Sequence, residues 1–155
     1  MADIKQKYGA STNLTITLAS LADGSAREST AVDNGTNLYV DVLVGGKMRA
    51  NSTGVDSAGY VNVWAYGSAD DGTTYDDGAT GTDSAHTINN NAKLLAVLEM
   101  NANSEDVEFS VPLSRVFNHV PEDWGVIIEN QSGAAFDSTA GNFEIHYKGI
   151  HYETV

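Results

Sequence analysis

The chain has 155 residues, of which 41% are hydrophobic and 19% charged, with 15 Gly, two Pro and no Cys. These values are typical of one folded domain rather than a disordered chain, and the absence of cysteine excludes disulfides and thiolate chemistry. The formal net charge is −13, from 21 acidic and 8 basic residues. Because the basic residues are scattered, we expect no binding to nucleic acid or to acidic membrane surfaces.

The predicted elements begin after a polar N-terminal arm, residues 1–12, which lacks the apolar run of a cleaved signal peptide. In residues 14–18 leucine and isoleucine alternate with threonine, which predicts a strand with one buried face. Residues 38–44 alternate in the same way, and the two glycines that follow are expected to end that strand. Residues 60–66 place small apolar side chains on one face and aromatic ones on the other. We expect the aromatic face to pack on a second sheet or on a neighbouring subunit.

The second half of the chain continues the pattern of short strands. Residues 93–100 fit either a buried strand or a short helix, and the Asn-rich segments on both sides favour the strand. Residues 107–111, 124–129 and 143–147 alternate again, and residues 114–118 suit a short helical turn. Seven or eight short strands with almost no helical pattern predict an all-β fold. We expect an antiparallel β-sandwich of jelly-roll or immunoglobulin-like type, formed by residues 13–155 as a single domain.

The candidate chemical sites are weak. Residues 68–91 form a long loop with five aspartates, but the spacing of a calcium loop is not met, so a solvated loop is favoured over a metal site. Glu144 and His146 share a strand face and leave a zinc site two ligands short. No Gly-x-Ser-x-Gly elbow occurs, and paired carboxylates for a glycosidase have no positive signal. We therefore expect no catalytic residue, no metal and no cofactor.

Several segments spread along the chain carry a family resemblance. They are residues 4–9, 14–22, 29–34, 59–63, 72–75, 77–83 and 121–130. In these segments, and nearly end to end, the chain resembles a group of small structural proteins encoded in the head and tail gene blocks of tailed bacteriophages. The resemblance implies a virion structural protein without enzymatic activity.

The resemblance implies more specifically a capsid decoration (cement) protein. It would be synthesised in the host cytoplasm, bind the outer surface of the phage head and stabilise contacts between major capsid proteins. The charge favours the outside of the head, because packaged DNA repels a protein of net charge −13. The alternatives are a carbohydrate-binding β-sandwich of the virion surface, which would stack sugars on aromatics such as Trp64 and Trp124, and a tail or neck structural protein.

Two sets of contact residues are expected. Basic side chains and one tyrosine of the arm suit an acidic capsid surface: Lys5, Lys7, Tyr8, Arg27, Lys47 and Arg49. The aromatic face suits contacts between copies in a homo-oligomer, which we expect to be a trimer: Tyr60, Trp64 and Tyr66. The arm is expected to clamp a neighbouring molecule.

Overall fold

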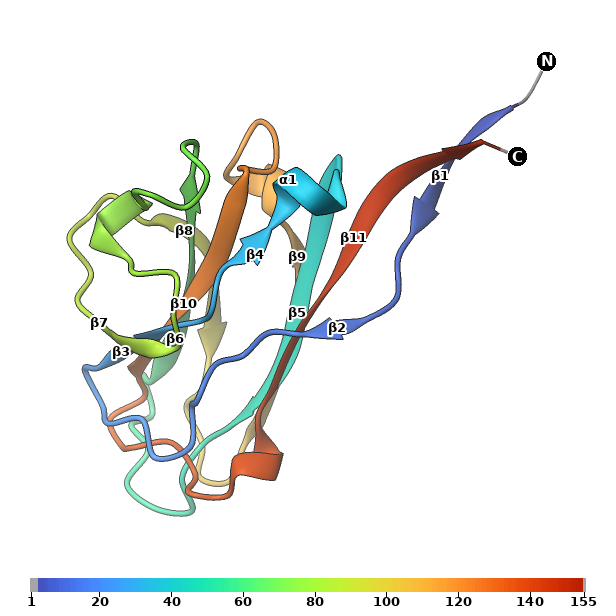
Figure 1. The fold of residues 1–155 in the computed structure, drawn as a ribbon. Coiled ribbons are helices and arrows are strands. Elements are labelled where there is room, and N and C mark those ends of the chain that lie inside the picture. The colour runs from blue at the N-terminus through green and yellow to red at the C-terminus, as the bar shows by residue number, and fades with distance from the viewer. Residues whose placement is uncertain (1–2, 155) are drawn as a thin grey trace.

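The computed structural model describes residues 3–154 and contains two antiparallel sheets packed face to face (Figure 1). The all-β sandwich predicted from the alternating segments is thereby confirmed. Within residues 3–154, helix is limited to single turns, which are α1 (Asn34–Asn37), η1 (Asp76–Gly78), η2 (Leu113–Arg115) and η3 (Ala140–Asn142).

The first sheet has the strand order β1-β11-β5-β9, and β2 also pairs with β11. Its strands are β1 (Ile4–Tyr8), β2 (Thr12–Asn13), β5 (Asp41–Arg49), β9 (Asp106–Pro112) and β11 (Glu144–Thr154). The second sheet has the order β7-β3-β10-β6-β8, and β4 also pairs with β10. Its strands are β3 (Ala26–Glu28), β4 (Val32–Asp33), β6 (Tyr60–Ser68), β7 (Ser84–His86), β8 (Lys93–Glu99) and β10 (Asp123–Gln131).

The main core lies between the two sheets. The inner face of β6 contributes small apolar side chains, as the period-two pattern predicts, and Trp124 of β10 packs edge-on against Tyr147 of β11 with ring centroids 5.2 Å apart. Nearly all of β10 is buried on both faces, because the loop of residues 69–91 covers its outer side. Burial on both faces explains why this strand is almost continuously apolar in its middle.

Residues 14–18 do not form the predicted strand. Leu14 and Leu18 are buried, as the alternation requires. However, the backbone N–H of Leu14 donates to the carbonyl of Ile145, whereas that of Thr17 donates to the Asp83 carboxylate at 3.1 Å. The alternation therefore reports burial of one face correctly, but the backbone bonds go to different partners instead of one neighbouring strand.

The predicted strand at residues 38–44 is shifted towards the C-terminus. β5 begins at Asp41, whereas Leu38 caps α1 with a left-handed φ of 56° and is 71% exposed. The two glycines do not end the strand. A Cβ on Gly46 would lie 2.2 Å from the carbonyl oxygen of Glu144, so glycine permits the close approach of β11 at this point.

The described part of the predicted arm is not a separate extended segment. Residues 4–8 form β1, which pairs in register with residues 150–154 at the end of β11. Met1 and Ala2 lie outside the described residues. The paired segments leave the sandwich together as a two-stranded ribbon, with both chain ends at its tip (Figure 1). We call residues 4–8 and 150–154 the ribbon.

Candidate interaction surfaces

The large hydrophobic side chains that are exposed in residues 3–154 gather in two places. One group lies on the ribbon and at its root: Ile4, Tyr8, Leu38, Val40 and Tyr152. We call it the ribbon patch. The other group lies on β6 and the neighbouring edge strand β8: Tyr60, Leu94 and Val97. We call it the body patch. Single exposed apolar residues are normal on soluble proteins, but clustered ones mark contact sites.

The ribbon has one apolar face and one charged face. In the antiparallel register Gln6 lies opposite Tyr152 and Lys7 lies opposite His151, so side chains of even-numbered residues share one face and those of odd-numbered residues share the other. The apolar face therefore carries Ile4, Tyr8 and Tyr152, which are between 58% and 71% exposed. On the charged face Lys7 forms an ion pair of 2.7 Å with Glu153.

The root of the ribbon is built around a close contact. Gly149 of β11 lies against the ring of Tyr39, and a Cβ at this position would come within 2.2 Å of the ring. Tyr39 in turn packs edge-on against Tyr147. A hollow of about 460 Å³ remains beside this contact, lined by Leu38, Val40 and Tyr152 among others. The apolar surface of the ribbon thus continues onto the sandwich without a cover.

The body patch lies on the outer face of the second sheet. A bulge between Val63 and Trp64 shifts the register with β8, so that Leu94 lies opposite Trp64 and Val97 lies opposite Asn62. Leu94 is 45% and Val97 56% exposed. The half-buried Trp64 donates its indole N–H to Glu129 at 2.9 Å, which leaves one edge of the patch polar.

The structure separates the expected capsid contacts into two kinds. Arg27 pairs with Asp83 at 2.5 Å and Arg49 pairs with Asp106 at 2.9 Å, so both guanidinium groups have a carboxylate of their own chain. Lys47 lies in register between Glu144 and Glu108. Lys5, Lys7 and Tyr8, in contrast, are all exposed on the ribbon.

One of the expected subunit contacts is not at the surface. Tyr60, Trp64 and Tyr66 share a strand face, as predicted, but Tyr66 is fully buried. Its hydroxyl donates to the carbonyl oxygen of Ser29 at 2.6 Å, and its ring meets that of Tyr75 edge-on at 5.5 Å. The residue that covers Tyr66 is Tyr75, in the loop of residues 69–91. The alternation of side chains within one strand does not predict where such a loop lies. Tyr75, Ala79 and Ile88 of this loop are the signal that it carries a core of its own.

The same loop is held by a buried polar network that the sequence analysis missed. His86 lies between two carboxylates, with Nδ1 3.5 Å from Glu28 and Nε2 3.1 Å from Asp77. Glu28 is completely buried and accepts hydrogen bonds from Thr80 and from the hydroxyl of Ser84. The network thus joins β3 to the loop through side chains separated by more than 50 positions in the sequence.

The aspartates of the loop act as hydrogen-bond acceptors for their own chain. Asp77 accepts from the backbone N–H groups of Asn89 and Asn91 at 2.8 and 2.7 Å. Burial opposes ionisation of Asp77, but these donors together with His86 outweigh it and lower its pKa. Hydrogen bonds from Ser68 and Thr74 lower the pKa of Asp70 to about 2.

The side chains considered for metal binding and the two tryptophans considered for sugar stacking are not brought together in residues 3–154. The described residues contain no group of three or more His, Asp or Glu side chains arranged to hold a metal ion. Trp124 is fully buried in the core, and only Trp64 of the two tryptophans reaches the surface. The aromatic side chains considered for sugar stacking are therefore not assembled into an exposed platform.

Comparisons with protein-family models, with curated proteins and with solved structures returned no match. Within residues 3–154, no helix combines the length and the hydropathy that a membrane span requires.

Proposed function

We propose that this protein is a non-enzymatic virion structural protein, a capsid decoration (cement) protein on the outer surface of a phage head. The observation that carries the proposal is the gathering of exposed apolar side chains into two separate patches on one small sandwich. A protein with two contact surfaces can bind a lattice subunit and a neighbouring molecule at once. The resemblance of the sequence to phage head and tail proteins supports the same function.

The shape of the molecule supports a lattice-binding role. The sandwich is closed by its own core, whereas the ribbon reaches beyond it (Figure 1). An isolated two-stranded ribbon is only marginally stable in water, so a partner that covers its apolar face would stabilise it. Many weak contacts of this kind add up on a shell that presents many equivalent sites.

The two patches have different parts in this proposal. The body patch of Tyr60, Leu94 and Val97 lies against the major capsid protein, and the ribbon reaches a neighbouring molecule. The charge of −13 is compatible with the outside of the head, where no packaged DNA repels it. A ligand that binds the assembled lattice but not the free capsid subunits stabilises the lattice by mass action.

The test uses heads assembled without this protein. We expect the purified protein to co-sediment with them saturably and to raise the temperature at which they rupture. The double variant Leu94→Ser, Val97→Ser removes the apolar part of the body patch and should weaken co-sedimentation at least tenfold. Glu108→Gln, an exposed change on the other sheet, is the control and should bind as the wild type does.

Two results would overturn the proposal. Heads with and without the protein could rupture at the same temperature, in which case the protein is not a cement. Alternatively, the protein could fail to sediment with heads while it sediments with tails, which would favour the tail or neck alternative.

A further inference from the structure

A second apolar hollow lies on the body of the sandwich, outside the ribbon. It is a groove of about 560 Å³ between the end of β6, η1 and the connection from β9 to β10. Its apolar lining comes from that connection: Val116, Phe117, Val120 and Pro121. Two carboxylates, Asp76 and Glu122, line it as well, and His119 is the one basic or titratable cationic group among the lining residues.

The groove lies in strongly negative surroundings. The buried Asp123 immediately follows Glu122, and its pKa is raised by burial and by the nearby charges of Asp33, Asp71 and Glu122. Burial is the larger of these causes, and the nearby carboxylates act in the same direction. The groove therefore combines an apolar lining with two carboxylates, Asp76 and Glu122, that form no ion pair within the described residues 3–154.

The ribbon has the opposite charge. Lys5 and Lys7 lie on it against a single carboxylate, Glu153, so residues 4–8 and 150–154 carry a formal charge of +1 while the rest of the chain carries −14. Its apolar face of Ile4, Tyr8 and Tyr152 has no cover. Lys5 and Lys7 lie on the other face of the ribbon from its apolar side chains. A ribbon inserted between the walls of the groove therefore places its apolar face against the connection from β9 to β10 and its lysines towards Asp76 of η1.

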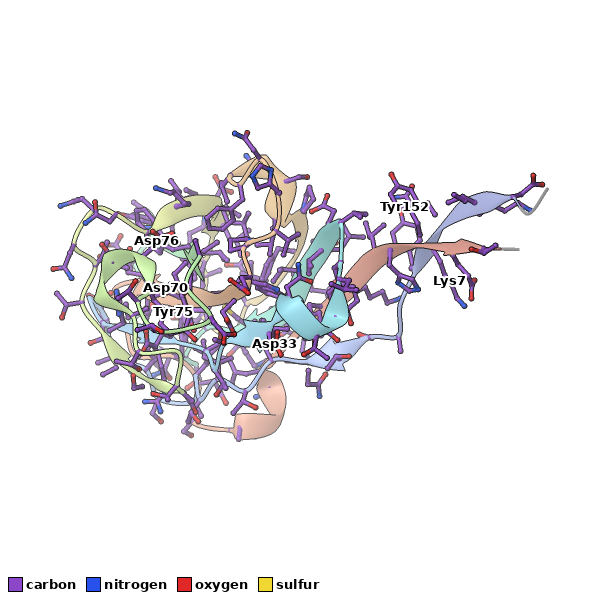
Figure 2. All side chains as sticks on the ribbon, turned by 45° about the horizontal axis from the view of Figure 1, so that its top comes forward. Lys7, Asp33, Asp70, Tyr75, Asp76 and Tyr152 are labelled. Carbon is purple, nitrogen blue, oxygen red and sulfur yellow. The ribbon has the colours of Figure 1, made fainter. Side chains whose placement is uncertain are left out.

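The ribbon cannot fill the groove of its own chain. Figure 2 shows Lys7 and Tyr152 on the projecting end of the molecule, whereas Asp76 of the groove lies at the opposite end. The two complementary surfaces can therefore meet only between different copies. A contact between two different surfaces is heterologous, and it closes into a ring when the rotation between copies allows it.

We propose that the apolar, basic ribbon of one copy docks into the apolar, acidic groove of a second copy. The partner of the ribbon is thus this same chain, and the contact joins copies head to tail. The attraction between Lys5 or Lys7 and the carboxylates of the groove offsets the repulsion expected between two chains of net charge −13. The inference does not depend on the proposed attachment to a phage head, because it concerns the protein alone.

The test is self-association of the full chain, measured by sedimentation equilibrium and light scattering up to about 200 µM. We expect a mass above the 16.4 kDa of one chain. Variant one carries Lys5→Glu and Lys7→Glu, and variant two carries Asp76→Lys and Glu122→Lys. Each variant alone should associate at least tenfold more weakly, because each places like charges at the contact.

The decisive measurement mixes the two variants. The ribbon of variant one is acidic and can pair with the basic groove of variant two. The ribbon of variant two is still basic and can pair with the unchanged acidic groove of variant one. An equimolar mixture should therefore associate again, although neither component does so alone. A pair of changes outside both surfaces, Lys47→Glu and Lys93→Glu, makes the same change in net charge as variant one and should leave the association constant within twofold.

Variant one also breaks the Lys7–Glu153 ion pair within the ribbon, so a second ribbon variant that keeps this pair serves as a control. Tyr8→Ser with Tyr152→Ser keeps every charge, and it should also weaken association at least tenfold. A wild-type chain that stays at 16.4 kDa throughout the concentration range would overturn the proposal. An oligomer that persists in variants one and two, or a mixture that fails to associate, would overturn it as well.

Discussion

The covering loop of residues 69–91 and the ribbon both extend from the sandwich, but their side chains meet opposite environments. The loop is acidic and rich in small polar residues, yet it folds back onto β10 and β6 and buries Tyr66 completely. The ribbon alternates apolar and charged residues like a half-buried strand, yet every residue of β1 is exposed. Figure 2 shows the two regions at opposite ends, with Asp70 and Tyr75 on one and Lys7 and Tyr152 on the other.

The difference teaches that a polar segment is integrated into the body when hydrogen bonds from its own chain are added to a small apolar core. In the loop, the carboxylates of Asp70, Asp77 and Asp83 each accept several hydrogen bonds from their own chain. Hydrogen bonds to charged groups are the stronger ones, so a polar loop can be held firmly. In the ribbon the apolar side chains have no other layer to contact, so their burial requires a partner.

The largest effect is expected for the contact between the loop and the sheet. Tyr66→Ala should lower the free energy of unfolding by about 3–5 kcal/mol, because it opens a cavity under the loop. Tyr66→Phe removes only the hydrogen bond to Ser29 and should cost about 1 kcal/mol. Chemical denaturation measures both. Equal, small losses for the two variants would show that the loop does not depend on this ring.

The buried carboxylate beneath the loop is expected to contribute the next largest effect. Glu28→Gln should lower the free energy of unfolding by about 2–3 kcal/mol, since the donors of Thr80 and Ser84 lose a charged acceptor. Glu108→Gln is the matched exposed control and should cost less than about 0.5 kcal/mol. If both variants unfold at the same denaturant concentration, Glu28 is not the anchor of the loop.

Acid should loosen the loop before it affects the ribbon. The folded pKa of Asp70 is about 2, below its ordinary value of 3.8, and the pKa values of Asp77 and Asp83 are lowered too. A carboxyl group whose pKa is lower in the folded than in the unfolded state stabilises the folded state. This contribution is complete above about pH 4 and is lost as the pH falls through the folded-state pKa. We expect the protection factors of amides in residues 69–91, referenced to intrinsic exchange at each pH, to fall between about pH 4 and pH 2.

Asp70→Asn is the check on this pH dependence. The variant should be less stable than the wild type at pH 7, and the difference should shrink as the pH falls towards 2. A difference that stays constant over this range would contradict the assignment of the lowered pKa to Asp70.

The smallest effect on stability is expected for the ribbon. Removing residues 1–8 should lower the free energy of unfolding by less than about 1 kcal/mol, because the exposed strand β1 buries no side chain and Gly9 keeps its hydrogen bond to Gly149. The same deletion should weaken association with partners at least tenfold. A loss of stability comparable to that of Tyr66→Ala would show that the ribbon belongs to the body after all.

Much of the fold could be predicted because the alternation of side chains is a local property. The inner face of β6 and the strand at residues 124–129 follow from period two. The strand at residues 93–99 follows from the Asn-rich segments that bound a short apolar run. Residues 14–18 show the limit of this reasoning, since burial of one face does not state which groups take the backbone hydrogen bonds. Short strands such as β3 and β7 carry too few residues for any period to appear.

The candidate contact residues were predictable only in part. Exposure of Lys5, Lys7 and Tyr8 agrees with a polar arm, but its pairing with residues 150–154 joins the two ends of the chain, and no local pattern indicates it. Burial of Tyr66 depends on a loop whose anchors, Glu28 and Asp77, lie far from it in the sequence.

By itself the sequence determined the all-β class and the strongly negative charge, because composition and period are properties of the chain alone. Only the tertiary structure decided which polar segment is covered and which apolar segment projects into solvent. The physical reason is that exposure is set by long-range pairing. The acidic loop is hydrogen-bonded to side chains far from it in the sequence, whereas residues 4–8 pair with residues 150–154 and leave the apolar face of the ribbon exposed.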